Sequence, residues 1–155
     1  MRILVALDLS VASEALLRFA ARLADQIGGE LIAMHVYAET DAQAAQQEAG
    51  LSLDRFLEHL RAEVGYLLGR AGADARRTRI VIADGAPVDA ILERASRDDV
   101  DMVVMGTHGR TGISRLLMGS VAEGVLRRAP CPVVVVPYGI LVGLVPGSAG
   151  RARTS

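Results

Sequence analysis

Short, continuous apolar runs recur along this chain, and they alternate with longer stretches whose apolar residues have helical spacing. The runs occupy residues 3–7, 31–37, 79–83, 101–105 and 132–136. The helical stretches occupy residues 11–27, 53–69, 87–95 and 120–128. An unbroken apolar run is typical of a strand whose two sheet faces are both covered. Strands that alternate with helices predict right-handed βαβ units, and therefore a single α/β domain with an open parallel sheet and helices on both faces.

Two segments do not fit this alternation. Residues 38–50 are rich in Ala and Gln and lack a clear apolar face, so we expect a surface loop or a frayed helical start there. Residues 138–155 lose the pattern as well, and we expect the last nine, residues 147–155, to be disordered. The sequence therefore predicts a domain over residues 1–137 that is followed by a tail.

Composition excludes several classes of function. The chain is 51% hydrophobic and carries a formal net charge of -1 without charged blocks, which argues against disorder and against a nucleic-acid-binding surface. All 17 basic residues are arginines. Because a Walker A loop needs a lysine to reach the phosphates, the lack of Lys excludes a P-loop nucleotide hydrolase.

The sequence also indicates where the protein works. The single Cys131 cannot form an internal disulfide, and we interpret it as a small buried apolar residue in a reducing compartment. Residues 2–7 already have the pattern of a strand and no cleavage site follows them, so we expect no signal peptide. The longest apolar stretch, residues 131–146, is too short and too interrupted by Pro and Gly to span a bilayer. We therefore expect a soluble cytoplasmic protein with no membrane partner.

The segment between the fourth and fifth predicted strands has the parts of a phosphate-binding loop. Gly106 and Gly109 follow the fourth strand, and Gly119-Ser120 open the next helix. Glycines let the backbone approach an anion closely, and the free N–H groups and dipole at a helix start favour negative charge. The loop leaves the carboxyl edge of the predicted sheet, where open α/β folds bind ligands. Ordinary turn glycines are the alternative, but three of them at this spacing between two buried strands favour a phosphate site.

With these residues in place, the chain resembles the universal stress protein family, and the resemblance covers about residues 1–137. The nucleotide-binding branch of that family carries the pattern Gly-x2-Gly-x9-Gly-Ser/Thr. The matching motifs are this pattern, as Gly106, Gly109 and Gly119-Ser120, the strand ends Ala6-Leu7-Asp8 and His35-Val36, and a closing Cys-Pro-Val-Val-Val.

The resemblance implies a Rossmann-like fold of the adenine nucleotide alpha hydrolase type, with five parallel strands in the order 3-2-1-4-5. It also implies ATP as the ligand, with Mg²⁺ or Mn²⁺ on the phosphates, because members with this glycine pattern are similar in binding ATP. The tail after Tyr138 departs from the family, which usually ends near the fifth strand. Residues 133–136 would otherwise form an exposed apolar edge, so we expect a homodimer that pairs through this strand.

The glycine loop supplies the predicted phosphate contacts. By resemblance, Ser120 would donate its hydroxyl to a phosphate oxygen, and as a preferred N-cap residue it would also cap the helix. A ring N–H of His108 could reach phosphate, although a solvent-exposed loop histidine is the alternative. Arg110 could balance phosphate charge, although a solvated arginine fits equally well. The predicted contacts at this end are Gly106, His108, Gly109, Arg110, Gly119, Ser120 and Val121.

Strand ends supply the predicted contacts to the nucleoside. By resemblance, Asp8 would meet the ribose or a phosphate-bound metal ion, and its alternative role is an acceptor that closes the turn into the first helix. Val36 is expected to place its backbone N–H and C=O against the adenine edge, although its side chain would pack in the core in either case. Ala6, Leu7 and Met105 would form the walls around adenine, and core packing is the alternative for each.

Catalysis has little support in the sequence. The chain has no G-x-S-x-G turn and no Cys/His cluster with zinc spacing. The leading hypothesis is therefore an ATP-binding regulator or sensor in a stress response. A slow magnesium-dependent ATPase that uses Asp8, and a dimeric interaction module that binds no nucleotide, are the alternatives.

Overall fold

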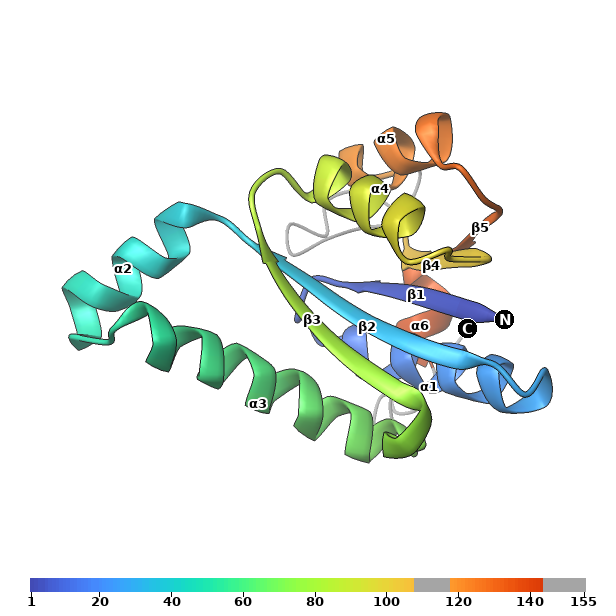
Figure 1. The fold of residues 1–155 in the computed structure, drawn as a ribbon, viewed down its shortest axis with the longest axis horizontal. Helices are drawn as coiled ribbons and strands as arrows, with labels where there is room; N and C mark the ends of the chain where they lie inside the picture. The colour runs from blue at the N-terminus through green and yellow to red at the C-terminus, as the bar shows by residue number, and fades with distance from the viewer. Residues whose placement is uncertain (108–117, 144–155) are drawn as a thin grey trace, which may run out of the picture.

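The computed structural model describes residues 1–107 and 118–143, which form a twisted sheet between two layers of helices (Figure 1). The strands are β1 (Arg2–Leu7), β2 (Glu30–Tyr37), β3 (Thr78–Asp84), β4 (Met102–Gly106) and β5 (Val133–Val136). They form one five-stranded sheet in the order β3-β2-β1-β4-β5, and every neighbouring pair is parallel. The fold class and the strand order expected from the sequence are confirmed.

Helices cover both faces of this sheet. The described helices are α1 (Ser13–Gln26), α2 (Glu39–Ala49), α3 (Leu53–Ala71), α4 (Pro87–Arg97), α5 (Ser120–Arg128) and α6 (Tyr138–Gly143). Figure 1 shows α1, α3 and α6 on one face and α4 and α5 on the other. A short 3-10 turn, Ala75–Arg77, leads into β3. None of the helices in the described part of the chain is long and apolar enough to cross a bilayer.

The central strand β1 shows why the strands appear in the sequence as unbroken apolar runs. Ile3 and Val5 belong to one buried cluster with residues of α1, while Leu4 belongs to a second cluster with residues of α4 and α5. All three side chains are 0% exposed. Because successive side chains of a strand point to opposite faces, a strand covered on both sides must be apolar at every position.

Residues 38–50, where we expected a loop or a frayed helical start, contain the regular helix α2. The backbone N–H of Ala38 donates to Oδ2 of Asp41 at 3.1 Å, which stabilises the start of the helix. Gly50 ends it in the left-handed conformation, with φ at 64°. Ala and Gln favour helix by intrinsic propensity, but none of the residues of α2 is buried. The helix therefore has no apolar face that the sequence pattern could reveal.

The tail was also predicted incompletely, because residues 138–143 form helix α6. The N–H groups of Ile140 and Leu141 lie 3.0 and 3.2 Å from the carbonyl oxygen of Pro137, which starts the helical turn. Leu141 is 1% exposed and joins the same buried cluster as α1. A helix of one and a half turns with one described buried residue gives too little periodicity to be recognised. The expected disorder of residues 147–155 concerns residues outside the described part of the chain.

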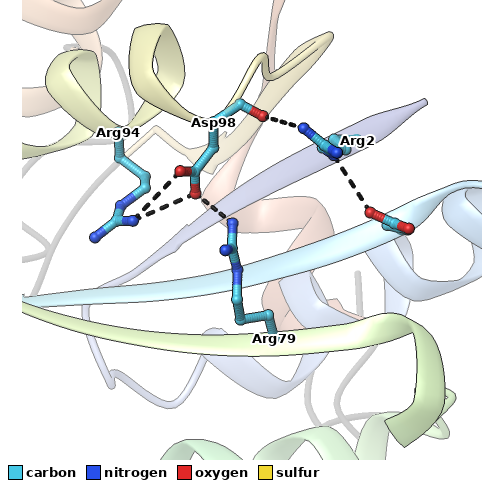
Figure 2. Close-up of polar contacts among 5 residues, drawn as sticks. Arg2, Arg79, Arg94 and Asp98 are labelled. Atoms are coloured by element: carbon cyan, nitrogen blue, oxygen red, sulfur yellow. Dashed lines mark hydrogen bonds and ion pairs between the residues drawn. The ribbon is translucent and has the colours of Figure 1, made fainter.

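Ion pairs and hydrogen bonds connect the strands at the amino edge of the sheet (Figure 2). The carboxylate of Asp98, just after α4, contacts the guanidinium groups of Arg94 and Arg79. Nη1 of Arg2 donates to the carbonyl oxygen of Asp98 at 2.8 Å, and its Nε lies 3.3 Å from Oε2 of Glu30. This network joins the starts of β1, β2 and β3 to the end of α4, at the edge opposite to the candidate site.

A cleft at the carboxyl edge of the sheet

A cleft of about 240 Å³ lies at the carboxyl ends of β1, β2 and β4. It holds every predicted binding residue that the structure describes, namely Ala6, Leu7, Asp8, Val36, Met105, Gly106, Gly119, Ser120 and Val121. The remaining lining residues are Ser10, Ala12, Ser13, Leu16, Met34, Pro87, Ile91, Thr107, Ala122 and Leu141. The other predicted phosphate contacts, His108, Gly109 and Arg110, lie outside the described residues.

The position of the cleft follows from the strand order. From β1 the sheet continues to β2 and β3 on one side and to β4 and β5 on the other, so the chain reverses direction across the sheet between β1 and β4. Open α/β sheets bind ligands in the crevice that this reversal creates. The residues that end β1 and β4, Leu7 and Gly106, both line the cleft.

Two backbone hydrogen bonds hold the two sides of the glycine loop together. The N–H of Gly119 donates to the carbonyl oxygen of Thr107 at 2.6 Å, so the chain returns to the point at which it left β4. The N–H of Thr107 donates in turn to the carbonyl oxygen of Val136, at the end of β5, at 3.1 Å. Gly106 and Gly119, which are far apart in the sequence, are thereby fixed at the same cleft.

The first turn of α5 faces this cleft. Its N-cap is Gly119, in an extended conformation, and within residues 1–107 and 118–143 no side chain caps the helix. The predicted capping role of Ser120 is therefore wrong, because Ser120 is the first helical residue and its side chain is exposed. The first residues of a helix have no intrahelical partners for their N–H groups. In α5 these residues are Ser120, Val121 and Ala122, and all three line the cleft.

Asp8 is positioned by the turn between β1 and α1. Its Oδ1 accepts hydrogen bonds from the N–H of Ser10 and from Oγ of Ser13, both at 3.0 Å. Ser13 is 1% exposed, so its hydroxyl bond to Asp8 is shielded from water. Leu9, within this turn, has a φ of 57°, which is uncommon for a residue other than glycine. The alternative role of Asp8 as an acceptor that closes the turn is confirmed, and the same carboxylate lines the cleft.

His35 contacts the backbone of Leu7, which lines the cleft. It is 5% exposed, and its Nδ1 lies 2.9 Å from the carbonyl oxygen of Leu7. Because a carbonyl oxygen only accepts, Nδ1 carries the proton in this contact. The imidazole thus joins the end of β2 to the end of β1.

Helix starts bring further residues to the cleft that the sequence analysis did not name. Ser13 is the first residue of α1, and Pro87 is the first residue of α4. A helix that follows a parallel strand begins at the carboxyl edge of the sheet, so its first turn lies near the ligand site. That rule could have identified Ser13 and Pro87 from the sequence. Leu141 could not be found in this way, because α6 itself was not predicted.

The acidic groups of the cleft limit what metal it can hold. Among the described residues that line the cleft, Asp8 alone carries a carboxylate. Across residues 1–107 and 118–143, no group of three or more His, Cys, Asp and Glu side chains is placed to hold a metal ion. These residues fit a metal ion that takes one protein carboxylate and obtains its other ligands from phosphate oxygens and water, as Mg²⁺ does at nucleotides.

Cys131 lies away from the cleft and is half-buried. Burial raises the pKa of its thiol, and the nearby charge of Asp101 acts in the same direction, while a hydrogen bond with the backbone of Val103 opposes them. A thiol with a raised pKa is mostly protonated at neutral pH and is a poor nucleophile. These features agree with a structural rather than a redox role for this residue.

Comparison with known proteins identifies the family. A family model described as "Universal stress protein family" matches residues 1–137. The universal stress protein in the QAH/OAS sulfhydrylase 3′ region of Thermus aquaticus is 33% identical over 112 residues, which cover 70% of this chain and 78% of that protein. Universal stress protein Mb2028c of Mycobacterium bovis is 33% identical over 141 residues, which cover 86% of this chain but only 44% of the relative. This chain thus spans less than half the length of the mycobacterial protein.

A solved structure agrees with these relatives. The crystal structure of a universal stress protein in complex with cAMP is 26% identical in sequence, with a TM-score of 0.65, and the match covers 88% of this chain and 95% of that one. The strand order, the glycine spacing and the matched residues 1–137 lead to the same assignment. This chain belongs to the universal stress protein family.

Proposed function

We propose that this cleft binds an adenine nucleotide, ATP in particular, and that the bound nucleotide makes the protein a regulator or sensor in a stress response. The observation that carries the proposal is the convergence, in one cleft, of residues from β1, β2, β4 and the first turn of α5. These residues were expected at a nucleotide site from the resemblance of the sequence to the family. The cAMP complex of a family member supports the same class of ligand.

The adenine ring would occupy the apolar part of the cleft beside α4. Ala6, Val36 and Met105 line this part, together with Ile91 of α4. Met105 and Ile91 are buried, at 4% and 3% exposed, so they form an apolar surface, shielded from water, on which a flat ring can pack. The backbone of Val36 would then recognise the edge of the base, which needs no polar side chain.

The phosphates would lie at the start of α5. Gly106 and Gly119 offer backbone without a Cβ, and the N–H groups of Ser120 and Val121 add donors and the positive end of the helix dipole. This arrangement holds negative charge without a lysine, which the chain lacks. His108, Gly109 and Arg110 would complete the phosphate contacts from the loop between β4 and α5.

A divalent cation, Mg²⁺ or Mn²⁺, would accompany the phosphates and neutralise part of their charge. Asp8 would supply one oxygen ligand. Its Oδ1 is already oriented by Ser10 and Ser13, so the carboxylate does not have to be ordered when the ligand arrives. Alternatively, the same carboxylate would accept hydrogen bonds from the ribose hydroxyls.

The functional unit would be a cytoplasmic homodimer that pairs through β5. This strand lies at the edge of the sheet, and three of its residues, Val133, Val134 and Val135, are only half-buried in the single chain. An apolar edge strand is a template for pairing with a second strand. Because Val136 holds Thr107 at the base of the glycine loop, the ligand site and this edge are directly connected.

The test is the identity of the nucleotide that the protein carries. The protein is purified without added nucleotide and denatured, and the released small molecules are identified by mass spectrometry. The stripped protein is then offered ATP, cyclic AMP or GTP, and its thermal unfolding is followed. We expect an adenine nucleotide to be released and to raise the unfolding temperature, while GTP has a smaller effect. A protein that is stabilised by none of the three nucleotides contradicts the proposal.

A further inference from the structure

Helix α6 lies beyond the residues that the family model matches, yet it reaches the candidate site. The family match ends at residue 137, and α6 occupies Tyr138–Gly143. Its Leu141 lines the cleft and is 1% exposed. Figure 1 shows α6 beside α1 on the same face of the sheet, where the two helices are in contact. Leu141 of α6 is therefore part of the wall of the cleft.

The cleft extends across the carboxyl edge and has two apolar sides. On the side of α4 and α5, Met34, Ile91 and Met105 belong to one buried cluster. On the side of α1, Leu16 and Leu141 belong to the other. A ligand that enters this cleft has α5 and the end of β4 on one side, and α1 with Leu141 on the other.

Leu141 is also fixed to the base of the glycine loop. Its N–H lies 3.2 Å from the carbonyl oxygen of Pro137. The residue before Pro137 is Val136, whose carbonyl oxygen accepts a hydrogen bond from the N–H of Thr107. Thr107 accepts a hydrogen bond from Gly119, the N-cap of α5. The position of Leu141 thus depends on the same few backbone contacts that close the phosphate end of the cleft.

We propose that Leu141 is a ligand-retaining residue, and that helix α6, which lies beyond the residues that the family model matches, forms a wall that slows the release of the nucleotide. The buried side chain excludes water from the α1 side of the cleft, and it keeps the base of the glycine loop in place while a ligand is bound. This inference rests on the proposed nucleotide site, and it adds a determinant of affinity that residues 1–137 do not contain.

The test compares neighbouring residues of the same short helix in the full-length protein. Leu141→Ala and Leu141→Val remove buried methylene groups, whereas Ile140→Ala changes a side chain that is 56% exposed. The dissociation rate of a fluorescent ATP analogue is measured by displacement with unlabelled ATP. Leu141→Ala removes three side-chain carbons. With about two of them in contact with the bound nucleotide, we expect release to be faster by about tenfold. Leu141→Val should show a smaller increase, and Ile140→Ala should release the analogue at the wild-type rate.

The outcomes separate this inference from the proposed function. If the wild-type protein does not bind the analogue, while its folding is intact, the nucleotide site itself is wrong and the inference is wrong with it. If the wild-type protein binds but both Leu141 variants release the analogue at the wild-type rate, only the role of α6 is wrong. Should Leu141→Ala fail to fold, the Leu141→Val variant decides, because it removes a single methylene group and keeps a branched apolar side chain.

Discussion

The hydroxyl of Ser13 donates to Oδ1 of Asp8 across 3.0 Å, and so the first residue of α1 holds the acidic residue of the cleft. This bond explains why a polar side chain is 1% exposed in an otherwise apolar layer. A buried hydroxyl that has a partner is tolerated, and one that loses its partner is costly. The same bond fixes the carboxylate at the ligand edge.

Replacement of Ser13 tests this relationship. Ser13→Ala removes the donor from Asp8, and we expect the free energy of unfolding to fall by about 1–2 kcal/mol. The affinity for ATP should fall as well, because Asp8 loses one of the groups that orient its carboxylate. Ser96→Ala is the control, since the hydroxyl of Ser96 is exposed and donates to the carbonyl oxygen of Leu92 in its own helix. Urea unfolding and calorimetry measure both effects, and a Ser13→Ala protein equal to wild type in both would contradict this role.

Gly124 sets the distance between α5 and α4. A Cβ at this position would lie 2.9 Å from Cγ2 and 3.1 Å from Cγ1 of Val88. Alanine normally stabilises a helix relative to glycine by about 1 kcal/mol. Here the clash with a stiff β-branched side chain outweighs that gain, because overpacking costs about 1–3 kcal/mol. We therefore expect Gly124→Ala to be destabilised in urea unfolding.

Two further variants control this prediction. Gly69 lies in α3, and a Cβ there would meet nothing within 4 Å, so Gly69→Ala should gain about 0.5–1 kcal/mol. Adding Val88→Ala to Gly124→Ala should relieve the clash and recover part of the stability. If Gly124→Ala and Gly69→Ala stabilise the protein equally, the two helices do not pack as closely as the structure shows.

Most of the fold was predictable from the sequence, because strands buried on both faces leave an unbroken apolar run. Ile3, Leu4 and Val5 illustrate this, since each is fully buried. The candidate site was predicted for a different reason, namely the glycine pattern and strand ends that the chain shares with the family. Of these residues, Gly106 and Gly119 line one cleft.

The remaining features leave no reliable pattern in the sequence. Helix α2 has no buried residue, so its periodicity could not appear. The apolar residues of α1 do not all lie on its buried face, since Phe19 is 36% exposed while Leu17 is 0% exposed. Serine at a helix start suggested an N-cap, but the extended backbone of Gly119 places Ser120 one residue inside the helix.

The stability that Glu14 contributes through its ion pairs should depend on pH. A hydrogen bond from Arg70 at 2.8 Å, with the charges of Arg70 and Arg18, lowers the pKa of Glu14 against a smaller opposing effect of burial. A carboxylate with a lowered pKa contributes stability above its ordinary pKa, and this contribution is lost as the pH falls through the lowered value. Wild type should therefore be more stable than Glu14→Gln at pH 7, and the difference should disappear in acid.

Urea unfolding between neutral and acid pH measures this difference. Arg70→Gln should reproduce most of the effect, because it removes the principal partner of Glu14. The double variant Glu14→Gln with Arg70→Gln should then differ little from either single variant. A gap between wild type and Glu14→Gln that is independent of pH would show that the ion pair is not its cause.

The proposed dimer predicts a distinct effect at β5. Carbonyl oxygens of Pro132 and Val136 accept from residues on the β4 side, so by the alternation of a strand Val135 directs its N–H away from β4. Val135→Pro removes that N–H from the free edge. We expect sedimentation to show a dimer for wild type and a folded monomer for Val135→Pro. A wild-type protein that stays monomeric at all concentrations would contradict pairing through this strand.

The most direct test of the account is a calorimetric titration of ATP with magnesium into wild type, Ser120→Ala and Ser120→Glu. A glutamate in the first turn of α5 suits the helix dipole, so folding is preserved, but its charge would repel the phosphates. We expect saturable heat for wild type, weaker binding for Ser120→Ala and none for Ser120→Glu. Equal binding by wild type and Ser120→Glu, or no heat with wild type, would contradict a phosphate site at the start of α5.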